Sequence, residues 1–246
     1  MSARDGTVAA ARAGSRAVDT EAALRDRWWQ PALYFIAKNT VKALFKVWLR
    51  TKVVGKPNVP MRGGLLVVSN HASYLDPPLI GVSMPRRVWF MARSTLFRNK
   101  AFGALIAGLG SFPVERAIDK VGEPGGGHGS GDIRAIRTVL AQLERGHPVL
   151  LFPEGARSPS GEMQPFQRGV AVLLKRSKCP VLPVAVSGVF EAWPRGKKPR
   201  LFPRRVVVRF GEAIPHDDLL KEGGEAAVKR LEDVIGGMLA EIERGR

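Results

Sequence analysis

The sequence contains a single cysteine, Cys179, in 246 residues. One thiol excludes a disulfide within the chain and is typical of a reducing compartment. The four histidines and this cysteine show no metal-ligand spacing, so we expect no zinc site. The sequence also has no phosphate-binding loop and no dinucleotide fingerprint, so we expect no bound cofactor.

Long hydrophobic runs are absent as well. The longest apolar run without a charge, residues 101–114, has 14 residues, whereas ~20 are needed to span a bilayer. Its glycines and its proline predict a buried helix that turns into a strand. Residues 1–20 lack the apolar core of a secretory signal. We expect a disordered tail there, with an organellar transit peptide as the alternative because acidic residues are few.

Acidic residues are outnumbered in the whole chain. It has 39 lysines and arginines against 22 aspartates and glutamates, which gives a net charge of +17. This excess favours anionic partners: nucleic acid, an anionic membrane surface or phosphorylated small molecules. Charge alone does not choose among them. The hydrophobic content of 45% is that of a folded globular protein.

Residues 28–50 predict an amphipathic helix that Pro31 can open. Basic residues recur there every four positions, at Lys38, Lys42, Lys46 and Arg50. Most apolar residues fall on the other side, namely Leu33, Ile36, Val41, Leu44, Val47 and Trp48. This pattern favours a helix lying in a membrane interface. The alternative is an ordinary helix docked on the core, because Phe35, Phe45 and Leu49 blur the amphipathicity.

Short apolar runs alternate with helical patterns along the rest of the chain. Strands are predicted at 64–70, 86–92, 110–116, 147–155, 179–188 and 205–211. Helices are predicted at 132–146, with Asp132 as a cap, at 167–178 and at 225–244. This alternation predicts a layered α/β fold.

The stretch VVSNHASYLDPP, residues 67–78, follows the first of these strands. The strand would deliver Asn70 and His71 to its C-terminal end, where open α/β sheets place their ligands. Asp76 before Pro77 is a helix-start signal, with Asp76 as the N-cap. A turn between His71 and Asp76 would bring the carboxylate to Nδ1 and leave Nε2 to take a proton from a substrate hydroxyl. A polar turn with a purely structural role is the alternative.

Two more predicted strands end in charged residues. The strand within 147–155 breaks into a loop that holds Glu154 and Arg157, and the strand within 110–116 ends at Arg116. Parallel strands would present these side chains and His71 to one crevice, where guanidinium groups can hold a phosphate. Each arginine taken alone is typical of a solvated surface.

Four blocks together resemble the glycerolipid acyltransferase family, which includes 1-acylglycerol-3-phosphate acyltransferases. They are NHASYLD, which matches the N-H-x4-D motif, FPVER, FPEGARS and VLPVAVSG, in the family's order between residues 70 and 188. The resemblance implies that His71 is the general base and Asp76 its partner. It also implies that acceptor binding involves Arg116, Glu154, Gly155 and Arg157, and that Pro183 shapes the pocket.

The family's fold is a mixed β-sheet core flanked by helices and often preceded by membrane-docking helices. The resemblance therefore implies an α/β fold of this kind with an N-terminal amphipathic membrane-docking helix. We divide the chain into a disordered tail (1–20), an amphipathic membrane-associating helical segment (21–54) and an α/β acyltransferase domain (55–246). Ala156 stands where the family usually has threonine, which leaves the identity of the acceptor open.

The implied activity is O-acyl transfer. The acyl group would pass from acyl-CoA or acyl carrier protein to a hydroxyl of 1-acylglycerol 3-phosphate. The enzyme would be a peripheral or monotopic protein on the cytoplasmic face of an anionic membrane, with no nucleic-acid partner.

Two alternatives remain open. One is the same chemistry on glycerol 3-phosphate, another lysophospholipid or a lyso-aminolipid. The other is a basic module that binds membranes or nucleic acid without turnover, which explains the charge but not the four blocks.

Overall fold

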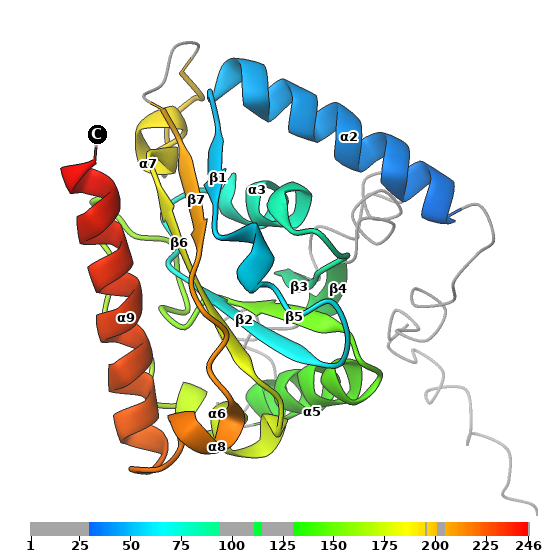
Figure 1. Cartoon of the computed structure of the whole chain (residues 1–246), viewed down its shortest axis with the longest axis vertical. Helices are drawn as coiled ribbons and strands as arrows, with labels where there is room; N and C mark the ends of the chain where they lie inside the picture. Colours follow the sequence, from blue (N-terminus) through cyan, green and yellow to red (C-terminus); the bar gives the residue numbers. More distant parts are fainter. Residues whose placement is uncertain (1–29, 94–110, 115–129, 195, 201–204, 246) are drawn as a thin grey trace, which may run out of the picture.

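The computed structural model describes residues 30–93, 111–114, 130–194, 196–200 and 205–245. The strands in these ranges form one sheet in the order β1-β7-β6-β2-β5-β3-β4 (Figure 1). They are β1 (Lys52–Val54), β2 (Leu65–Ser69), β3 (Trp89–Arg93), β4 (Ser111–Val114), β5 (Pro148–Leu151), β6 (Val181–Ser187) and β7 (Val207–Phe210).

Helices cover both faces of this sheet (Figure 1). The longer ones are α2 (Gln30–Trp48), α3 (Asp76–Ser83), α5 (Ser130–Glu144), α6 (Val170–Ser177) and α9 (Gly224–Arg244). The short ones are η1 (Lys56–Asn58), α7 (Val189–Ala192) and α8 (His216–Leu219).

Alternate side chains of the central strands enter two hydrophobic layers. In β2, Leu66 and Val68 pack with residues of α5, α6 and α9, whereas Leu65 and Val67 pack with residues of α2 and α3. All four side chains are fully buried. Burial on both faces explains why the strand sequences are continuous apolar runs, and not runs that alternate with polar residues.

The strand directions bring the C-terminal ends of β2 to β6 to one edge of the sheet. β2 pairs in parallel with β5 and β6, and β3 pairs in parallel with β5 and β4. β7 runs antiparallel to β6 and parallel to β1, so the sheet is mixed, as the resemblance implies. The loops that follow β2, β5 and β6 therefore meet at this C-terminal edge.

Helix α2 has one face docked on the domain and another face exposed. Phe45 and Leu49 are buried in the same layer as α3, and Lys38 Nζ donates a 2.7 Å hydrogen bond to the carbonyl of Met84. Of the three residues that blurred the predicted pattern, Phe45 and Leu49 thus lie on the docked side, whereas Phe35 is exposed. Lys38 is half-buried. Four apolar residues stay between 55% and 81% exposed, namely Phe35, Ile36, Leu44 and Val47.

No helix in the described ranges has the length and hydropathy of a membrane span. The helix within 28–50 is present, and the predicted strands are present with shifted ends. The helix expected within 101–110 lies outside the described residues.

One sequence prediction needs correction, and one short strand was not predicted. Helix α5 begins at Ser130, so Asp132 lies inside the first turn and does not precede the helix. Strand β1 was not expected, because only three residues form it. It pairs in parallel with β7 at the edge of the sheet, and the predicted division of the chain at residues 54 and 55 stays a prediction.

Candidate active site

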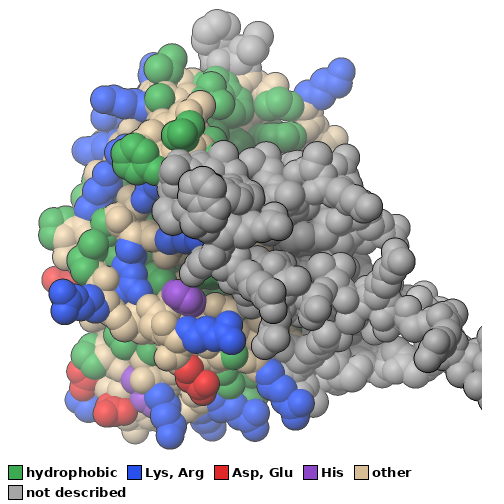
Figure 2. Space-filling view, turned by 90° about the vertical axis from the view of Figure 1, so that its right-hand side faces the viewer, with side chains coloured by type: hydrophobic (Ala, Val, Ile, Leu, Met, Phe, Trp, Pro, Cys, Tyr) green, Lys and Arg blue, Asp and Glu red, His purple; other side chains and the backbone are tan. Residues whose placement is uncertain are grey.

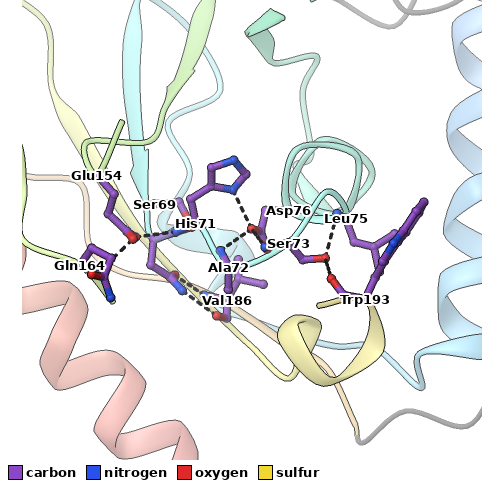
Figure 3. Close-up of polar contacts among 11 residues, drawn as sticks. Ser69, His71, Ala72, Ser73, Leu75, Asp76, Glu154, Gln164, Val186 and Trp193 are labelled. Carbon is purple, nitrogen blue, oxygen red and sulfur yellow. Dashed lines mark hydrogen bonds and ion pairs between the residues drawn. The ribbon is translucent and has the colours of Figure 1, made fainter. Parts of the chain in front are cut away.

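His71 and Asp76 face each other across a short turn at the C-terminal edge of the sheet (Figure 3). His71 Nδ1 lies 2.8 Å from Asp76 Oδ2. Because a carboxylate only accepts hydrogen bonds, Nδ1 carries the proton and Nε2 keeps its lone pair in the neutral ring. The Asp76 side chain is fully buried, whereas that of His71 is 14% exposed. The turn therefore combines a buried orienting carboxylate with a partly accessible imidazole, in the arrangement that the sequence predicted.

Asp76 does not cap helix α3 as predicted. Leu75 is the residue before the helix, Asp76 is its first residue, and no side chain caps the helix. Asp76 Oδ2 instead accepts hydrogen bonds of 2.8 Å from the backbone amides of Ala72 and Ser73. The N-cap assignment is wrong because the chain before the helix turns its amides toward the carboxylate. Asp76 thus closes the turn that carries the His71 ring.

The backbone around His71 is fixed by two other segments. The His71 amide donates a 2.6 Å hydrogen bond to Glu154 Oε1, and the His71 carbonyl accepts one of 2.8 Å from the Ser158 amide. The preceding residue, Asn70, bridges to β6: its Nδ2 donates to the Val186 carbonyl and its Oδ1 accepts from the Val186 amide, both at 2.9 Å. The position of the imidazole is therefore set by β6 and by the loop after β5.

Glu154 uses both carboxylate oxygens on backbone amides. Oε1 accepts from His71, and Oε2 accepts a 3.1 Å hydrogen bond from Gln164 (Figure 3). Burial raises the pKa of Glu154 from 4.5 to about 7, although the two amides lower the pKa and the charge of Asp76 raises it further. The parallel pairing of β2 and β5 brings Glu154 to His71, as predicted. Glu154 supports the loop and the base, and its role in acceptor binding stays a prediction.

Phe152 and Gly155 belong to the loop that follows β5. The Phe152 ring stacks on the His71 ring, with centroids 4.0 Å apart and an angle of 18° between the planes. Gly155 has a φ of +73°, and its amide donates a 3.1 Å hydrogen bond to the Phe152 carbonyl. An L side chain is strained at this φ, so Gly155 allows the turn that brings Glu154 back to His71.

Arg157 lies over the ring of Tyr74, which belongs to the turn between His71 and Asp76. The Arg157 Cζ atom is 3.3 Å from the Tyr74 ring centroid, and that ring lies 5.6 Å from the Trp193 ring. The structure thus brings Arg157 to the predicted site. Ala156, at the position where the family usually has threonine, is exposed.

Two predicted residues remain, Arg116 and Pro183. Arg116 follows β4 and lies outside the described residues. Pro183 lies within β6, in register with Val68, and a Cβ atom built on Gly211 would lie 2.9 Å from Pro183 Cγ. Pro183 is therefore part of the sheet interior, and its effect on the pocket stays a prediction.

The sequence placed Asn70 at the strand end without assigning it a role, and it did not indicate the other supporting residues. The role of Asn70 could have been predicted, since a short amide directly before a candidate base at a strand end is well placed to bond a neighbouring strand. Phe152, Tyr74 and Gln164 gave no local signal, because their contacts with the site join segments that are distant in the sequence.

An imidazole oriented by a buried carboxylate, at the C-terminal edge of an α/β sheet, has the geometry that a general base for a hydroxyl requires. Residues 50–187 match the model of the Acyltransferase family, which is more than half of the chain. The chain belongs to this family, and the enzyme class that the motifs imply, an O-acyltransferase, is confirmed.

Relatives and a solved structure agree with this assignment. The 1-acyl-sn-glycerol-3-phosphate acyltransferase of Bacillus subtilis is 24% identical over 212 residues, 86% of this chain and 97% of that protein. The chloroplastic 1-acyl-sn-glycerol-3-phosphate acyltransferase BAT2 of Brassica napus is 25% identical over 71% of this chain, which spans only 48% of that protein.

The crystal structure of the 1-acyl-sn-glycerophosphate (LPA) acyltransferase PlsC from Thermotoga maritima matches with a TM-score of 0.70 and 23% identity. The match covers 91% of this chain and 86% of that chain. At this identity the likeness shows the fold, and it confirms the mixed sheet flanked by helices.

Proposed function

We propose that this chain transfers an acyl group from a thioester to the free hydroxyl of 1-acylglycerol 3-phosphate, which yields phosphatidic acid. The observation that carries the proposal is the 2.8 Å contact between His71 Nδ1 and the buried Asp76 carboxylate. This contact fixes the ring tautomer in which Nε2 can accept a proton. The names of the relatives support the choice of acceptor.

The reaction requires two proton transfers, one from the acceptor hydroxyl to His71 and one from His71 to the leaving thiolate. His71 Nε2 takes the proton of the acceptor hydroxyl as its oxygen attacks the thioester carbonyl. Asp76 stabilises the imidazolium that results. When the tetrahedral intermediate collapses, the carbon–sulfur bond breaks and the imidazolium returns the proton to the leaving thiolate. The thioester is acyl-CoA or acyl carrier protein, and no acyl-enzyme is formed.

Positive charge beside the base supports a phosphate-bearing acceptor. The Arg157 guanidinium lies on Tyr74 in the turn that carries His71, and a planar guanidinium can hold a phosphate bidentately. We assign Arg116 the same task. Glu154 and Gly155 shape the loop that presents Arg157, and Pro183 would act on the pocket from within the sheet.

Helix α2 supports an association with the membrane. It exposes Phe35, Ile36, Leu44 and Val47, and it also carries lysines, as helices in a membrane interface do. The acceptor is an amphiphile that resides in the same interface. We therefore assign the protein to the membrane surface as a peripheral or monotopic protein. The cytoplasmic face is consistent with its single buried thiol, Cys179.

Product analysis tests the proposed reaction and its acceptor. The protein is given one acyl-CoA, or the matching acyl carrier protein, with a panel of 1-acylglycerol 3-phosphate, glycerol 3-phosphate, lysophosphatidylcholine and a lyso-aminolipid. Lipid mass spectrometry should find phosphatidic acid as the main product. Faster acylation of another acceptor in the panel would overturn the proposed acceptor. If none of the acceptors were acylated, the alternative of a binding module without turnover would be favoured.

A further inference from the structure

The segment that follows α7 carries exposed basic side chains. Lys197, Lys198 and Arg200 are exposed, and the ion pairs identified among the described residues involve other side chains. We call these three residues the basic rim. Like charges this close repel one another, so the basic rim creates a local positive potential that an anionic partner would relieve.

Two tryptophan side chains hold the backbone of the basic rim. Trp193 Nε1 donates a 2.8 Å hydrogen bond to the Lys197 carbonyl, and Trp48 Nε1 donates one of 2.9 Å to the Arg200 carbonyl. The Arg200 amide also donates a 2.9 Å hydrogen bond to the Ala192 carbonyl. The basic rim is thus attached both to α7 and to the C-terminal end of α2.

The basic rim lies at the same edge of the sheet as His71. Because β6 runs parallel to β2, α7 and the basic rim leave the sheet where His71 leaves it. Ser73, in the turn between His71 and Asp76, donates a 2.9 Å hydrogen bond to the Trp193 carbonyl (Figure 3). A surface that binds the basic rim is therefore close to the candidate active site.

Exposed apolar side chains accompany this charge. Leu44 and Val47, near the end of α2 that carries Trp48, are 55% and 81% exposed. In the upper part of Figure 2, at the height of α2 in Figure 1, hydrophobic side chains lie next to those of lysine and arginine. A lipid interface accommodates both kinds of side chain, whereas nucleic acid would meet the basic ones alone.

We propose that the basic rim is a docking surface for anionic phospholipid, which holds the edge of the sheet that carries His71 against the membrane while Leu44 and Val47 enter the interface. The inference rests on the proposed function only in taking the acceptor to lie in that membrane. In this orientation the acceptor reaches His71 without leaving the interface. Each basic side chain near an anionic surface strengthens binding about fivefold, so we expect about 100-fold from the three.

The test compares two triple variants of the full chain. The first is Lys197→Gln, Lys198→Gln and Arg200→Gln. The matched control is Lys175→Gln, Arg176→Gln and Lys178→Gln, which removes three exposed charges at the end of α6, before β6 begins. Flotation measures binding to phosphatidylcholine vesicles with and without phosphatidylglycerol. Acyl transfer is measured with water-soluble short-chain substrates and with an acceptor embedded in vesicles.

The basic-rim variant should lose about 100-fold in affinity for vesicles with phosphatidylglycerol, and activity on the embedded acceptor should fall with it. Its activity on short-chain substrates, and the binding of the control variant, should stay within about twofold of the wild type. Equal losses in both variants, or unchanged binding of the basic-rim variant, would overturn the docking surface. Binding to duplex DNA is measured at the same salt concentration. If the basic-rim variant lost affinity for the DNA but not for the vesicles, the docking surface would also be overturned. If vesicle binding depended on the basic rim but the wild type transferred no acyl group, the proposed function would be refuted and the docking surface would stand.

Discussion

The backbone amide of His71 donates a 2.6 Å hydrogen bond to Glu154 Oε1, so the loops after two neighbouring parallel strands are joined at the candidate base. The ring of His71 meets a different carboxylate, that of Asp76, at 2.8 Å. Two buried carboxylates therefore hold different parts of His71: Glu154 holds its backbone amide, and Asp76 orients its imidazole ring.

Stability should fall as the pH rises through the titration of Glu154. Its pKa is raised to about 7 in the folded protein from its ordinary value of 4.5. Between these two values the folded protein binds more protons than the unfolded chain, so the free energy of unfolding decreases as the pH rises and levels off above the folded pKa. We expect the titration of Glu154 to lower stability by up to ~3 kcal/mol between about pH 5 and pH 8.

The variant Glu154→Gln isolates this effect, because an amide does not titrate. The free energy of unfolding in urea is measured for both proteins at each pH. The value for the wild type minus that for the variant should decrease as the pH rises. A difference that does not change with pH would contradict the raised pKa.

Replacing Asp76 with asparagine should reduce kcat and preserve the fold. The amide oxygen can still accept from Ala72 and Ser73, but it carries no charge to stabilise an imidazolium. We expect kcat to fall by about 10²- to 10⁴-fold. Asp217→Asn, beside the His216 ring on the surface, makes the same change at a remote His–Asp contact and should have no effect. A kcat close to that of the wild type would show that Asp76 only closes the turn.

Removing the Tyr74 ring should weaken binding of phosphate-bearing acceptors. The ring lies under the Arg157 guanidinium, so Tyr74→Leu removes this contact while Tyr74→Phe retains it. For the leucine variant we expect the KM for 1-acylglycerol 3-phosphate to rise about 3- to 10-fold, with kcat almost unchanged. Steady-state kinetics of the three proteins decide this. Equal KM values for the leucine and phenylalanine variants would count against the contact.

The fold was predictable where local patterns dominate. The strand before His71 and helix α5 each have an apolar pattern in the sequence that matches their buried side chains in the structure. Because β2 and β5 are parallel neighbours, their C-terminal ends bring His71 and Glu154 together. Strand β1 was missed because three residues carry almost no pattern. On α2, the sequence could not separate the docked face from the exposed one, since both are apolar and only packing on the sheet distinguishes them.

The site was predictable in its chemistry and less so in its geometry. The spacing of His71 and Asp76 indicated a turn, but not that Asp76 would accept the amides of that turn in place of capping α3. The stack of Phe152 on His71 and the bond from Gln164 to Glu154 arise only when distant segments fold together.

The most direct test of His71 as the base is turnover of 1-acylglycerol 3-phosphate by His71→Ala, compared with His216→Ala. His216 also lies 2.9 Å from a carboxylate, that of Asp217, but it is on α8, outside the candidate site. Circular dichroism first verifies that both variants are folded. We expect kcat of His71→Ala to fall about 10³-fold or more and kcat of His216→Ala to match that of the wild type. Turnover by His71→Ala within about tenfold of the wild type would contradict the assignment of His71 as the general base.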